Sequence, residues 1–341
     1  MKKLEVAFAD RSYNIIIEKG SIANMASLFG ISHKRAFIIT DSGVPKEYAE
    51  AVASGFTNSY IYTVSSGEES KSINVFGEAL SKMVEFGMTR VDVCIAVGGG
   101  VVGDLSGFVA ASYMRGIDFY NVPTTTLSMV DSSIGGKTAV NHSGIKNIVG
   151  AFYQPKGVLI DIDTLKTLDD RQWASGLAES IKMAMTSDKE LFEIFEKQSD
   201  IHSNIEEIIL RSLMIKKAVV EADEREGGLR KILNFGHTYG HAVEADAEMK
   251  GYYHGECVAI GMVAVSYGEV RDRLISVLNK YSLPIEYRDE GGHALEFISK
   301  DKKCKGSNID IILVPEIGTF EIRSMSIEKF IKLIKAGGLD R

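Results

Sequence analysis

The fold is decided by residues 91–104, VDVCIAVGGGVVGD, where a short apolar run leads directly into a cluster of glycines. The run at 91–97 has the length of a buried strand, and a helix-like stretch follows the glycines. Gly98, Gly100 and Gly103 satisfy the G-x-G-x-x-G spacing. Glycines let the backbone approach an anion, and a helix N-terminus offers unpaired N–H groups. The segment predicts a strand–turn–helix unit that binds a nucleotide; a tight turn without a ligand is the alternative.

Other short apolar runs extend this pattern on both sides. They lie at 36–40, 60–64, 119–122 and 157–160, after an alternating pair at 4–8 and 13–17 that indicates a hairpin. Helix-like stretches at 44–54 and 73–86 separate several of them. Strands that alternate with helices predict a parallel, wound sheet. We therefore expect a Rossmann-like α/β domain over residues 1–160, in which Asp118 has the spacing of a ribose acceptor.

The pattern changes near Thr164. From Arg171 onward the apolar residues recur mainly at helical spacing, most clearly at 191–195, 205–220 and 258–270. A length of 341 residues favours two domains, at roughly 150 residues each. We expect a mainly α-helical second domain over residues 161–341, with an active site in the cleft between the two domains.

Composition excludes several classes of protein. Apolar residues make up 45% and charged residues 25%, as in an ordinary globular chain. The net charge of −7 argues against a nucleic-acid or anionic-membrane partner. No apolar run approaches the ~18 residues of a membrane span, and the charged start at Met1 is unlike a signal peptide. Three scattered cysteines suggest no disulfide framework, so we expect a cytoplasmic protein.

A polar run at 115–147 is rich in hydroxyls, glycines and lysines and shows little helix or strand periodicity. Long irregular loops in compact domains are uncommon unless they are functional. The run therefore predicts a phosphate-binding loop, with a plain surface loop as the alternative. The segment at 67–71 is, taken alone, a solvated loop before a helix.

Four side chains form a candidate metal site. His237 and His241 lie at i and i+4, so a helix places both imidazoles on one face. His254 follows after a short polar connection, and Glu179 is a carboxylate among small and apolar residues. Two imidazoles and one carboxylate are typical of a catalytic zinc with an open position. The pattern leaves open which three of the four bind the metal.

The charged segment at 223–226 has the composition of a solvated turn. Beyond it, Arg230, Asn234 and His237 would face one site if the segment were helical. The alternative for Arg230 is a surface position, paired with Glu226 one turn earlier.

Together these segments resemble the 3-dehydroquinate synthase family of sugar-phosphate cyclases. The likeness covers about residues 41–303, and it rests on the glycine turn and on the order and spacing of five further motifs: YMRG at 113–116, VDSSIGGKT at 130–138, KN at 146–147, GAFYQP at 150–155 and LNFGH at 233–237. The resemblance implies NAD in the α/β domain and one Zn²⁺ or Co²⁺ in the helical domain.

The resemblance also implies roles for individual residues. The metal ligands would be Glu179, His237 and His254. The residues that contact NAD would be Asp41, Glu68, Lys71, Gly99, Gly100, Val101, Val102, Gly103, Asp104, Thr124, Thr125, Lys137, Lys146, Thr164, Leu165, Lys166 and Thr167. The catalytic residues would be Lys137, Lys182, Lys216 and His241. The residues that bind substrate would be Arg115, Asp131, Asn147, Arg230 and Asn234, with either Lys302 or Lys303.

The chain departs from the family pattern at Gly43 and has two adjacent lysines at the position of a catalytic lysine. Gly43 stands where the family often has Asn, which would remove one hydrogen bond to the ribose and weaken NAD binding slightly. Lys217 is adjacent to Lys216, so the register of that catalytic lysine rests on the local alignment.

The implied activity is the conversion of 3-deoxy-D-arabino-heptulosonate 7-phosphate, a phosphorylated sugar acid, to 3-dehydroquinate and phosphate in the shikimate pathway of aromatic amino acid biosynthesis. The steps would be transient oxidation by NAD, phosphate elimination, re-reduction, ring opening and aldol closure. The alternatives are a 2-deoxy-scyllo-inosose synthase, a metal-dependent alcohol dehydrogenase and a non-catalytic NAD- or metal-binding module. The sequence leaves the oligomeric state open, with a homodimer as one option.

Overall fold

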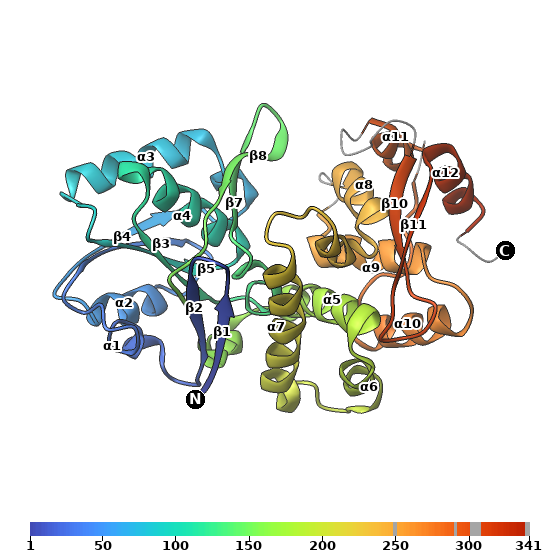
Figure 1. The fold of residues 1–341 in the computed structure, drawn as a ribbon, viewed down its shortest axis with the longest axis horizontal. Coiled ribbons are helices and arrows are strands. Elements are labelled where there is room, and N and C mark those ends of the chain that lie inside the picture. Colours follow the sequence, from blue (N-terminus) through green and yellow to red (C-terminus); the bar gives the residue numbers. More distant parts are fainter. Residues whose placement is uncertain (248–250, 290–291, 301–307, 338–341) are drawn as a thin grey trace. The chain divides into compact units, whose positions relative to one another are not determined.

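The computed structural model describes residues 1–247, 251–289, 292–300 and 308–337 (Figure 1). The chain divides into two compact units, Met1–Asp169 and Asp170–Arg341, and each is described by itself. Within the described residues no helix is both long and apolar enough to cross a membrane. Lys302 and Lys303 lie outside the described residues.

Unit 1 is built on a seven-stranded sheet with the order β1-β2-β9-β6-β5-β3-β4. Its strands are β1 (Lys2–Ala7), β2 (Ser12–Ile17), β3 (Arg35–Asp41), β4 (Asn58–Val64), β5 (Val93–Gly98), β6 (Asp118–Pro123) and β9 (Gly157–Ile160). The β1–β2 pair is the antiparallel hairpin expected from the sequence, and the other neighbours pair in parallel. The predicted wound α/β sheet is confirmed.

Helices cover both faces of this sheet (Figure 1). Cys94 and Ala96 of β5 pack in a core with α3 (Ile73–Glu85) and α4 (Gly100–Ser112). Ile95 and Val97 of the same strand pack in a second core with α1 (Met25–Leu28) and α2 (Lys46–Ser54). Because both faces of β5 are buried, the strand is a continuous apolar run in the sequence, without polar alternation.

The strand order creates a topological switch point between β3 and β5. From β3 the chain proceeds to β4 on one side, and from β5 it proceeds to β6 on the other. In open α/β sheets, ligands bind at the carboxyl ends of the strands that flank such a point. Asp41 ends β3 and Gly98 ends β5, so the glycine turn lies at that edge.

The polar run at 115–147 is not the irregular loop that its composition suggested. It contains the short η3 (Tyr113–Arg115), β6, the π-helical η4 (Ser128–Ser132) and the antiparallel hairpin of β7 (Lys137–His142) and β8 (Ile145–Phe152). Most side chains of β8 are exposed, so this strand lacks the alternating apolar pattern that marks a half-buried strand. In β7 only Thr138 and Val140 are buried, which is too short an alternation to stand out in a polar sequence. The expectation of an irregular loop over residues 115–147 is therefore wrong.

Unit 2 is mainly helical, as expected. Its helices are α5 (Asp170–Ser187), α6 (Lys189–Lys197), α7 (Ile205–Ala222), α8 (His237–Ala247), α9 (His254–Ala264), α10 (Gly268–Lys280), α11 (His293–Lys300) and α12 (Ile327–Lys335). The expectation of a single helix over residues 258–270 is wrong, because α9 ends before residue 265 and α10 begins at Gly268. A hairpin of β10 (Asn308–Leu313) and β11 (Glu321–Ser326), which the sequence did not predict, completes the unit.

Short 3-10 segments connect these elements. They are η1 (Ile22–Asn24), η2 (Glu68–Ser70), η5 (Ile162–Thr167), η6 (His202–Asn204) and η7 (Leu229–Asn234). The last of these replaces the regular helix that would have continued from Arg230 into His237.

Two glycines of α9 allow neighbouring backbone to approach closely. A Cβ at Gly255 would lie 1.9 Å from the Ser175 carbonyl oxygen of α5. A Cβ at Gly261 would lie 1.9 Å from the carbonyl oxygen of Gly236, just before α8. Any larger residue at these positions would push the backbones apart, so both glycines set the spacing of the three helices.

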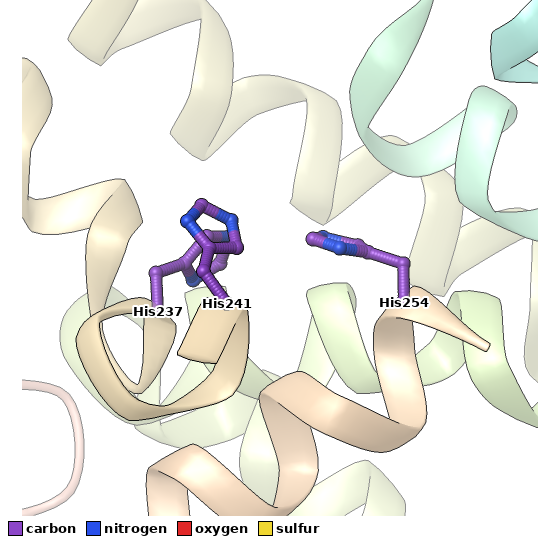
Figure 2. Close-up of side chains that lie close together, drawn as sticks. All are labelled: His237, His241 and His254. Carbon is purple, nitrogen blue, oxygen red and sulfur yellow. The ribbon is translucent and has the colours of Figure 1, made fainter. Parts of the chain in front are cut away.

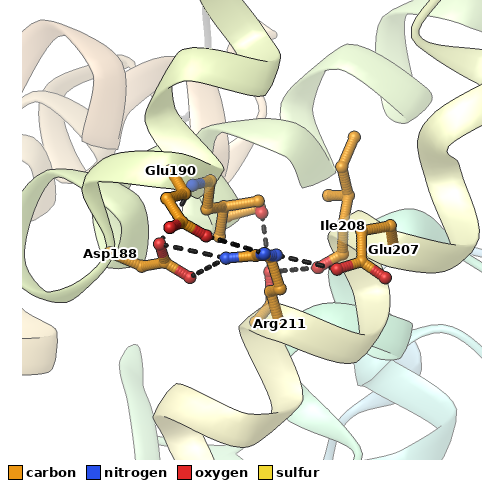
Figure 3. A network of polar contacts seen from close by, with 8 residues as sticks. Asp188, Glu190, Glu207, Ile208 and Arg211 are labelled. Atoms are coloured by element: carbon orange, nitrogen blue, oxygen red, sulfur yellow. Dashed lines mark hydrogen bonds and ion pairs between the residues drawn. The ribbon is translucent and has the colours of Figure 1, made fainter.

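A network of ion pairs joins α6 to α7 (Figure 3). The Arg211 guanidinium lies 3.1 Å from Asp188, 3.0 Å from Glu190 and 2.8 Å from Glu207. The hydrogen bond to Glu207 is the largest of the interactions that raise the pKa of Arg211. The network holds the N-terminal end of α6 against α7, the helix that carries Lys216.

Candidate functional site

In unit 1, a buried lysine lies between two carboxylates. Lys71 Nζ is 2.6 Å from Asp104 Oδ2 and 3.8 Å from Glu68 Oε1. Asp104 lies in the first turns of α4, directly after the glycine turn. The structure thus brings together Glu68, Lys71 and Asp104, which the sequence analysis expected to contact NAD.

Asn141 connects this group to the β7–β8 hairpin. Its side-chain Nδ2 donates to Glu68 Oε1 at 2.8 Å, and its backbone N–H donates to the Lys71 carbonyl at 2.7 Å. Its Oδ1 accepts from the backbone N–H of Asn147 at 2.8 Å. The predicted set of site residues omits Asn141. Its only signal was membership of the polar run, because strand pairing across the hairpin cannot be seen in local spacing.

The glycine turn has the features of an anion cradle. Gly99 precedes α4 in extended conformation, and no side chain caps that helix. A Cβ at Gly99 would lie 3.1 Å from Thr125, and one at Gly100 would lie 3.2 Å from Ser132 Oγ. The Thr124 N–H donates to the Gly98 carbonyl at 3.0 Å, which holds the end of β6 against the turn. The uncapped helix start therefore fits a phosphate group.

Asp41 lies at the same edge of the sheet. Burial raises its pKa, while hydrogen bonds from the backbone N–H groups of Gly43 and Val44 act in the opposite direction. The bond from Gly43 is 2.7 Å long. The carboxylate is thus held in place at the carboxyl end of β3.

Two expected contacts lie away from this edge. Asp118 begins β6, at the amino end of the strand, and pairs with Lys34 at 2.8 Å. The interpretation of Asp118 as a ribose acceptor is therefore wrong. Arg115 lies beyond the far end of α4, roughly 20 Å along the helix from Gly100, and has a φ of 68°. The structure does not bring Arg115 together with Lys71 and Asp104.

Other predicted residues of unit 1 lie in η4, in the β7–β8 hairpin and in η5. Asp131 lies in η4, Lys137 begins β7 and Lys146 lies in β8. The segment from Thr164 to Thr167 forms η5, where Tyr48 Oη of α2 is 2.9 Å from Thr167 Oγ1. Lys166 is exposed and pairs with Asp163 at 2.8 Å.

In unit 2, three imidazoles from two helices gather around one point (Figure 2). One ring nitrogen from each of His237, His241 and His254 lies within 4.8 Å of the others. His237 and His241 share one face of α8, as their spacing predicted, and His254 is the first residue of α9. Their rings stand 4.9 to 5.8 Å apart between centroids.

Glu179 of α5 faces the same point from a buried position. Its Oε1 lies 3.5 Å from Nε2 of His237 and 3.5 Å from Nε2 of His254. Its Oε2 pairs with Lys182, one turn further along α5. Neither carboxylate oxygen makes a hydrogen bond of ordinary geometry to the described residues. A carboxylate that is buried in this way requires cationic partners.

The charges of this cluster shift the pKa values of its members. Burial would raise the pKa of Glu179, but Lys182 and His254 lower it to about 2. Burial lowers the pKa of His237 well below its usual value, and Lys182 adds to that effect. Burial would also lower the pKa of His254, but Glu179 and Glu244 raise it. Glu179 is therefore ionised, and His237 is neutral.

Contacts outside the cluster orient its imidazoles. Nδ1 of His237 lies 3.2 Å from the Phe235 carbonyl oxygen, and Nδ1 of His254 lies 2.9 Å from Glu244 Oε2. At the start of α9, Arg171 donates to both oxygens of Glu256 at 2.7 and 2.8 Å. Because Arg171 and Glu179 lie on the same helix, this ion pair ties the start of α9 to α5.

Arg230 is buried, at 3% exposure, which contradicts the alternative of a surface ion pair. Its Nη1 donates to the Glu224 carbonyl at 2.6 Å. The Asp223 carboxylate accepts from the backbone N–H groups of Gly227, Gly228 and Arg230, so it organises the loop before η7. The segment at 223–226 is thus not only a solvated turn, because Asp223 fixes the backbone of the loop that leads to Arg230.

Lys182 and Lys216 are buried as well, at 2% and 5% exposure. Asn234 Nδ2 donates to Glu226 Oε1 at 3.2 Å, so Glu226 enters this group although the sequence analysis did not select it. The backbone of Glu226 has a φ of 62°, a conformation that the sequence does not predict for a glutamate.

Comparison with known families assigns most of the chain to two family models. The family model described as 3-dehydroquinate synthase N-terminal matches residues 61–175, and the one described as 3-dehydroquinate synthase C-terminal matches residues 176–304. The 3-dehydroquinate synthase of Streptococcus sanguinis (strain SK36) is 39% identical, over 98% of this chain and 99% of that protein. The enzyme of Clostridium botulinum (strain Alaska E43 / Type E3) is 41% identical, over 97% and 100%.

Solved structures show the same fold. A 2-deoxy-scyllo-inosose synthase complexed with carbaglucose-6-phosphate, NAD⁺ and Co²⁺ has a TM-score of 0.86 at 25% identity, over 99% of this chain and 100% of that one. The 2-epi-5-epi-valiolone synthase of Streptomyces hygroscopicus subsp. jinggangensis 5008, with NAD⁺ and Zn²⁺ bound, has a TM-score of 0.88 at 25% identity, over 97% and 98%. The matches of both family models and the near full-length relatives show that the chain belongs to the 3-dehydroquinate synthase family.

Proposed function

We propose that the protein is a 3-dehydroquinate synthase, a phosphate-eliminating carbon–oxygen lyase that converts 3-deoxy-D-arabino-heptulosonate 7-phosphate to 3-dehydroquinate. The observation that carries the proposal is the cluster in which buried Glu179 faces His237 and His254 beside Lys182. It lies in a chain that matches both family models. The cytoplasmic location stays a prediction, and the buried cysteines Cys94 and Cys257 are compatible with it.

The donor atoms fit a divalent metal. Two imidazole Nε2 atoms and one carboxylate are a common ligand set for Zn²⁺, and Co²⁺ accepts the same set. The proposed ligands are Glu179, His237 and His254. Glu179 is preferred to exposed His241 because its buried Oε1 lies 3.5 Å from Nε2 of both His237 and His254 and has no hydrogen-bond partner among the described residues, and we assign His241 to the substrate. When bound, the metal supplies a Lewis acid that polarises substrate oxygens.

Unit 1 fits NAD. The uncapped start of α4 suits the pyrophosphate, and Asp41, at the end of β3, stands where a ribose hydroxyl binds in folds of this type. When bound, NAD supplies transient oxidation of the C5 hydroxyl, which acidifies the neighbouring C6 proton. Solved relatives at 25% identity contain NAD⁺ together with Co²⁺ or Zn²⁺.

Buried cations of unit 2 suit an anionic substrate. Lys182, Lys216 and Arg230 are nearly inaccessible in a protein whose net charge is −7. A planar guanidinium can hold a carboxylate with two parallel hydrogen bonds, so we assign Arg230 to the substrate carboxylate. We assign Lys182, Lys216 and His241 to proton transfer and to the stabilisation of negative charge that develops on the substrate. In unit 1, Arg115, Asp131, Lys137 and Asn147 remain proposed contacts.

The test is a product assay. Purified protein is incubated with the heptulosonate phosphate, NAD and Zn²⁺, and dehydroquinate and inorganic phosphate are measured. We expect both products in equal amounts, their loss after chelation, and recovery with Zn²⁺ or Co²⁺. A Glu179→Gln variant should stay inactive after metal is restored. Full activity in demonstrably metal-free protein, or no dehydroquinate from the metal-loaded protein, would contradict the proposal.

A further inference from the structure

A carboxylate outside the proposed ligand set contacts one of the ligands. Glu244 lies two turns after His237 on α8, and its Oε2 is 2.9 Å from Nδ1 of His254 on α9. Both side chains are partly shielded from water, with 23% exposure for Glu244 and 30% for His254. The contact therefore joins the two helices that carry the imidazoles, immediately beside the cluster.

This contact determines which nitrogen of His254 can bind a metal. A carboxylate only accepts hydrogen bonds, so Nδ1 of His254 must carry the proton. In the neutral ring Nε2 then has its lone pair available, and Nε2 is the atom that lies 3.5 Å from Glu179 Oε1. The Phe235 carbonyl has the same effect on His237, whose Nε2 is also 3.5 Å from Glu179. Both rings thus present the same nitrogen to the carboxylate.

We propose that Glu244 is a positioning residue that fixes the orientation and tautomer of His254 and increases the donor strength of its Nε2 toward a divalent metal. This inference rests on the proposed function, because it takes the cluster to be a metal centre. Hydrogen bonds from such carboxylates orient metal-binding histidines, and their loss typically weakens metal affinity about 10- to 100-fold. His237 has a backbone carbonyl as its partner, so His254 is the ligand whose support can be removed by substitution.

Three variants separate this role from general destabilisation. Glu244→Ala removes both the acceptor and its charge, whereas Glu244→Gln retains an amide oxygen that can accept from Nδ1. Glu196→Gln is the matched control. Glu196 has 22% exposure, close to that of Glu244, and it forms an ion pair with Arg273 elsewhere in unit 2. Thermal unfolding of each variant reports whether the fold is retained.

The measurement is the dissociation constant of Zn²⁺ and of Co²⁺, determined by competition with a chelator. It is accompanied by the visible absorption spectrum of the Co²⁺-loaded protein. We expect Glu244→Ala to weaken binding about 10- to 100-fold. Glu244→Gln should recover part of that loss and shift the Co²⁺ spectrum. Glu196→Gln should match the unsubstituted protein in both readouts.

The outcomes against the inference are distinct. If the unsubstituted protein binds the metal and both Glu244 variants bind it within twofold with an unchanged Co²⁺ spectrum, Glu244 has no positioning role, and the proposed function stands. If the unsubstituted protein binds neither ion, the proposed metal centre and this inference fail together. If Glu196→Gln weakens binding as much as Glu244→Gln does, the effect is general and the inference is wrong.

Discussion

The choice of metal ligands depends on which side chains surround the buried carboxylate of Glu179. Glu179 lies within 3.5 Å of His237 and His254, while His241 is the exposed member of the three imidazoles. We predict that His237→Ala and His254→Ala abolish stoichiometric Zn²⁺ binding and that His241→Ala retains most of it. Metal content after dialysis measures this directly. A variant at position 241 that empties the site, while the one at 254 remains loaded, would reverse the assignment.

Arg230 allows a sharper test of substrate recognition. Removing one partner of a desolvated ion pair costs about 3–5 kcal/mol, so Arg230→Ala should lower kcat/KM for the heptulosonate phosphate by roughly two to four powers of ten. Arg230→Lys should restore little, because lysine lacks the planar fork. Exposed Arg225 of the same loop provides the control, Arg225→Ala, with nearly unchanged kinetics. Near-normal kinetics of Arg230→Ala would remove Arg230 from the substrate site.

Asp223 is expected to make stability depend on pH. Hydrogen bonds from the backbone N–H groups of Arg230 and Gly228 lower the pKa of Asp223 below 3.8. The pKa of Asp223 is lower in the folded than in the unfolded protein. The stabilisation that its carboxylate gives the folded state is therefore complete above the unfolded pKa and is lost as the pH falls through the folded pKa. Asp223→Asn should reduce the free energy of unfolding by about 1 kcal/mol near neutral pH, as the loss of a helix-capping side chain does. Below pH 3.8 the reduction should be smaller. Denaturant titrations at several pH values measure it; a difference independent of pH would contradict this account.

At the scale of elements, the close approach of α9 to α5 positions His254 opposite Glu179. Gly255→Ala would bring a Cβ to 1.9 Å from the Ser175 carbonyl oxygen. We expect a loss of about 1–3 kcal/mol in the free energy of unfolding, together with weaker Zn²⁺ binding. Gly77→Ala is the control, because Gly77 lies within α3 with open space around its Cα. It should be neutral or stabilising by up to about 1 kcal/mol. Equal effects of the two changes would show that this close approach is unimportant.

The elements also show what could be predicted from the sequence. The strand and helix around residues 91–104 were predictable because β5 is apolar on both faces and glycines mark the turn. The β7–β8 hairpin was missed because β8 is mostly exposed. The shared face of His237 and His241 follows from helical periodicity, whereas the approach of Glu179 and Glu244 to His254 depends on how three helices pack. Residue spacing contains no information on that packing.

The molecule as a whole is acidic, yet unit 2 buries three cationic side chains that we assign to an anionic substrate. Lys182, Lys216 and Arg230 are each at most 5% exposed, against a net charge of −7. Buried cations of this kind suit a substrate that has both a carboxylate and a phosphate. These two anionic groups also distinguish the substrate of the proposed cyclase from that of a simple alcohol dehydrogenase, which would need neither group.

We propose that NAD is used and regenerated within each turnover, so the balance between released phosphate and NADH is the decisive measurement. The metal-loaded protein is given excess heptulosonate phosphate and NAD at a small fraction of the substrate concentration. We predict that the phosphate released exceeds the NAD supplied many times over, with an equal amount of dehydroquinate and no net NADH absorbance. NADH that accumulates in proportion to the substrate consumed, or phosphate release that stops at one equivalent of NAD, would contradict the claim.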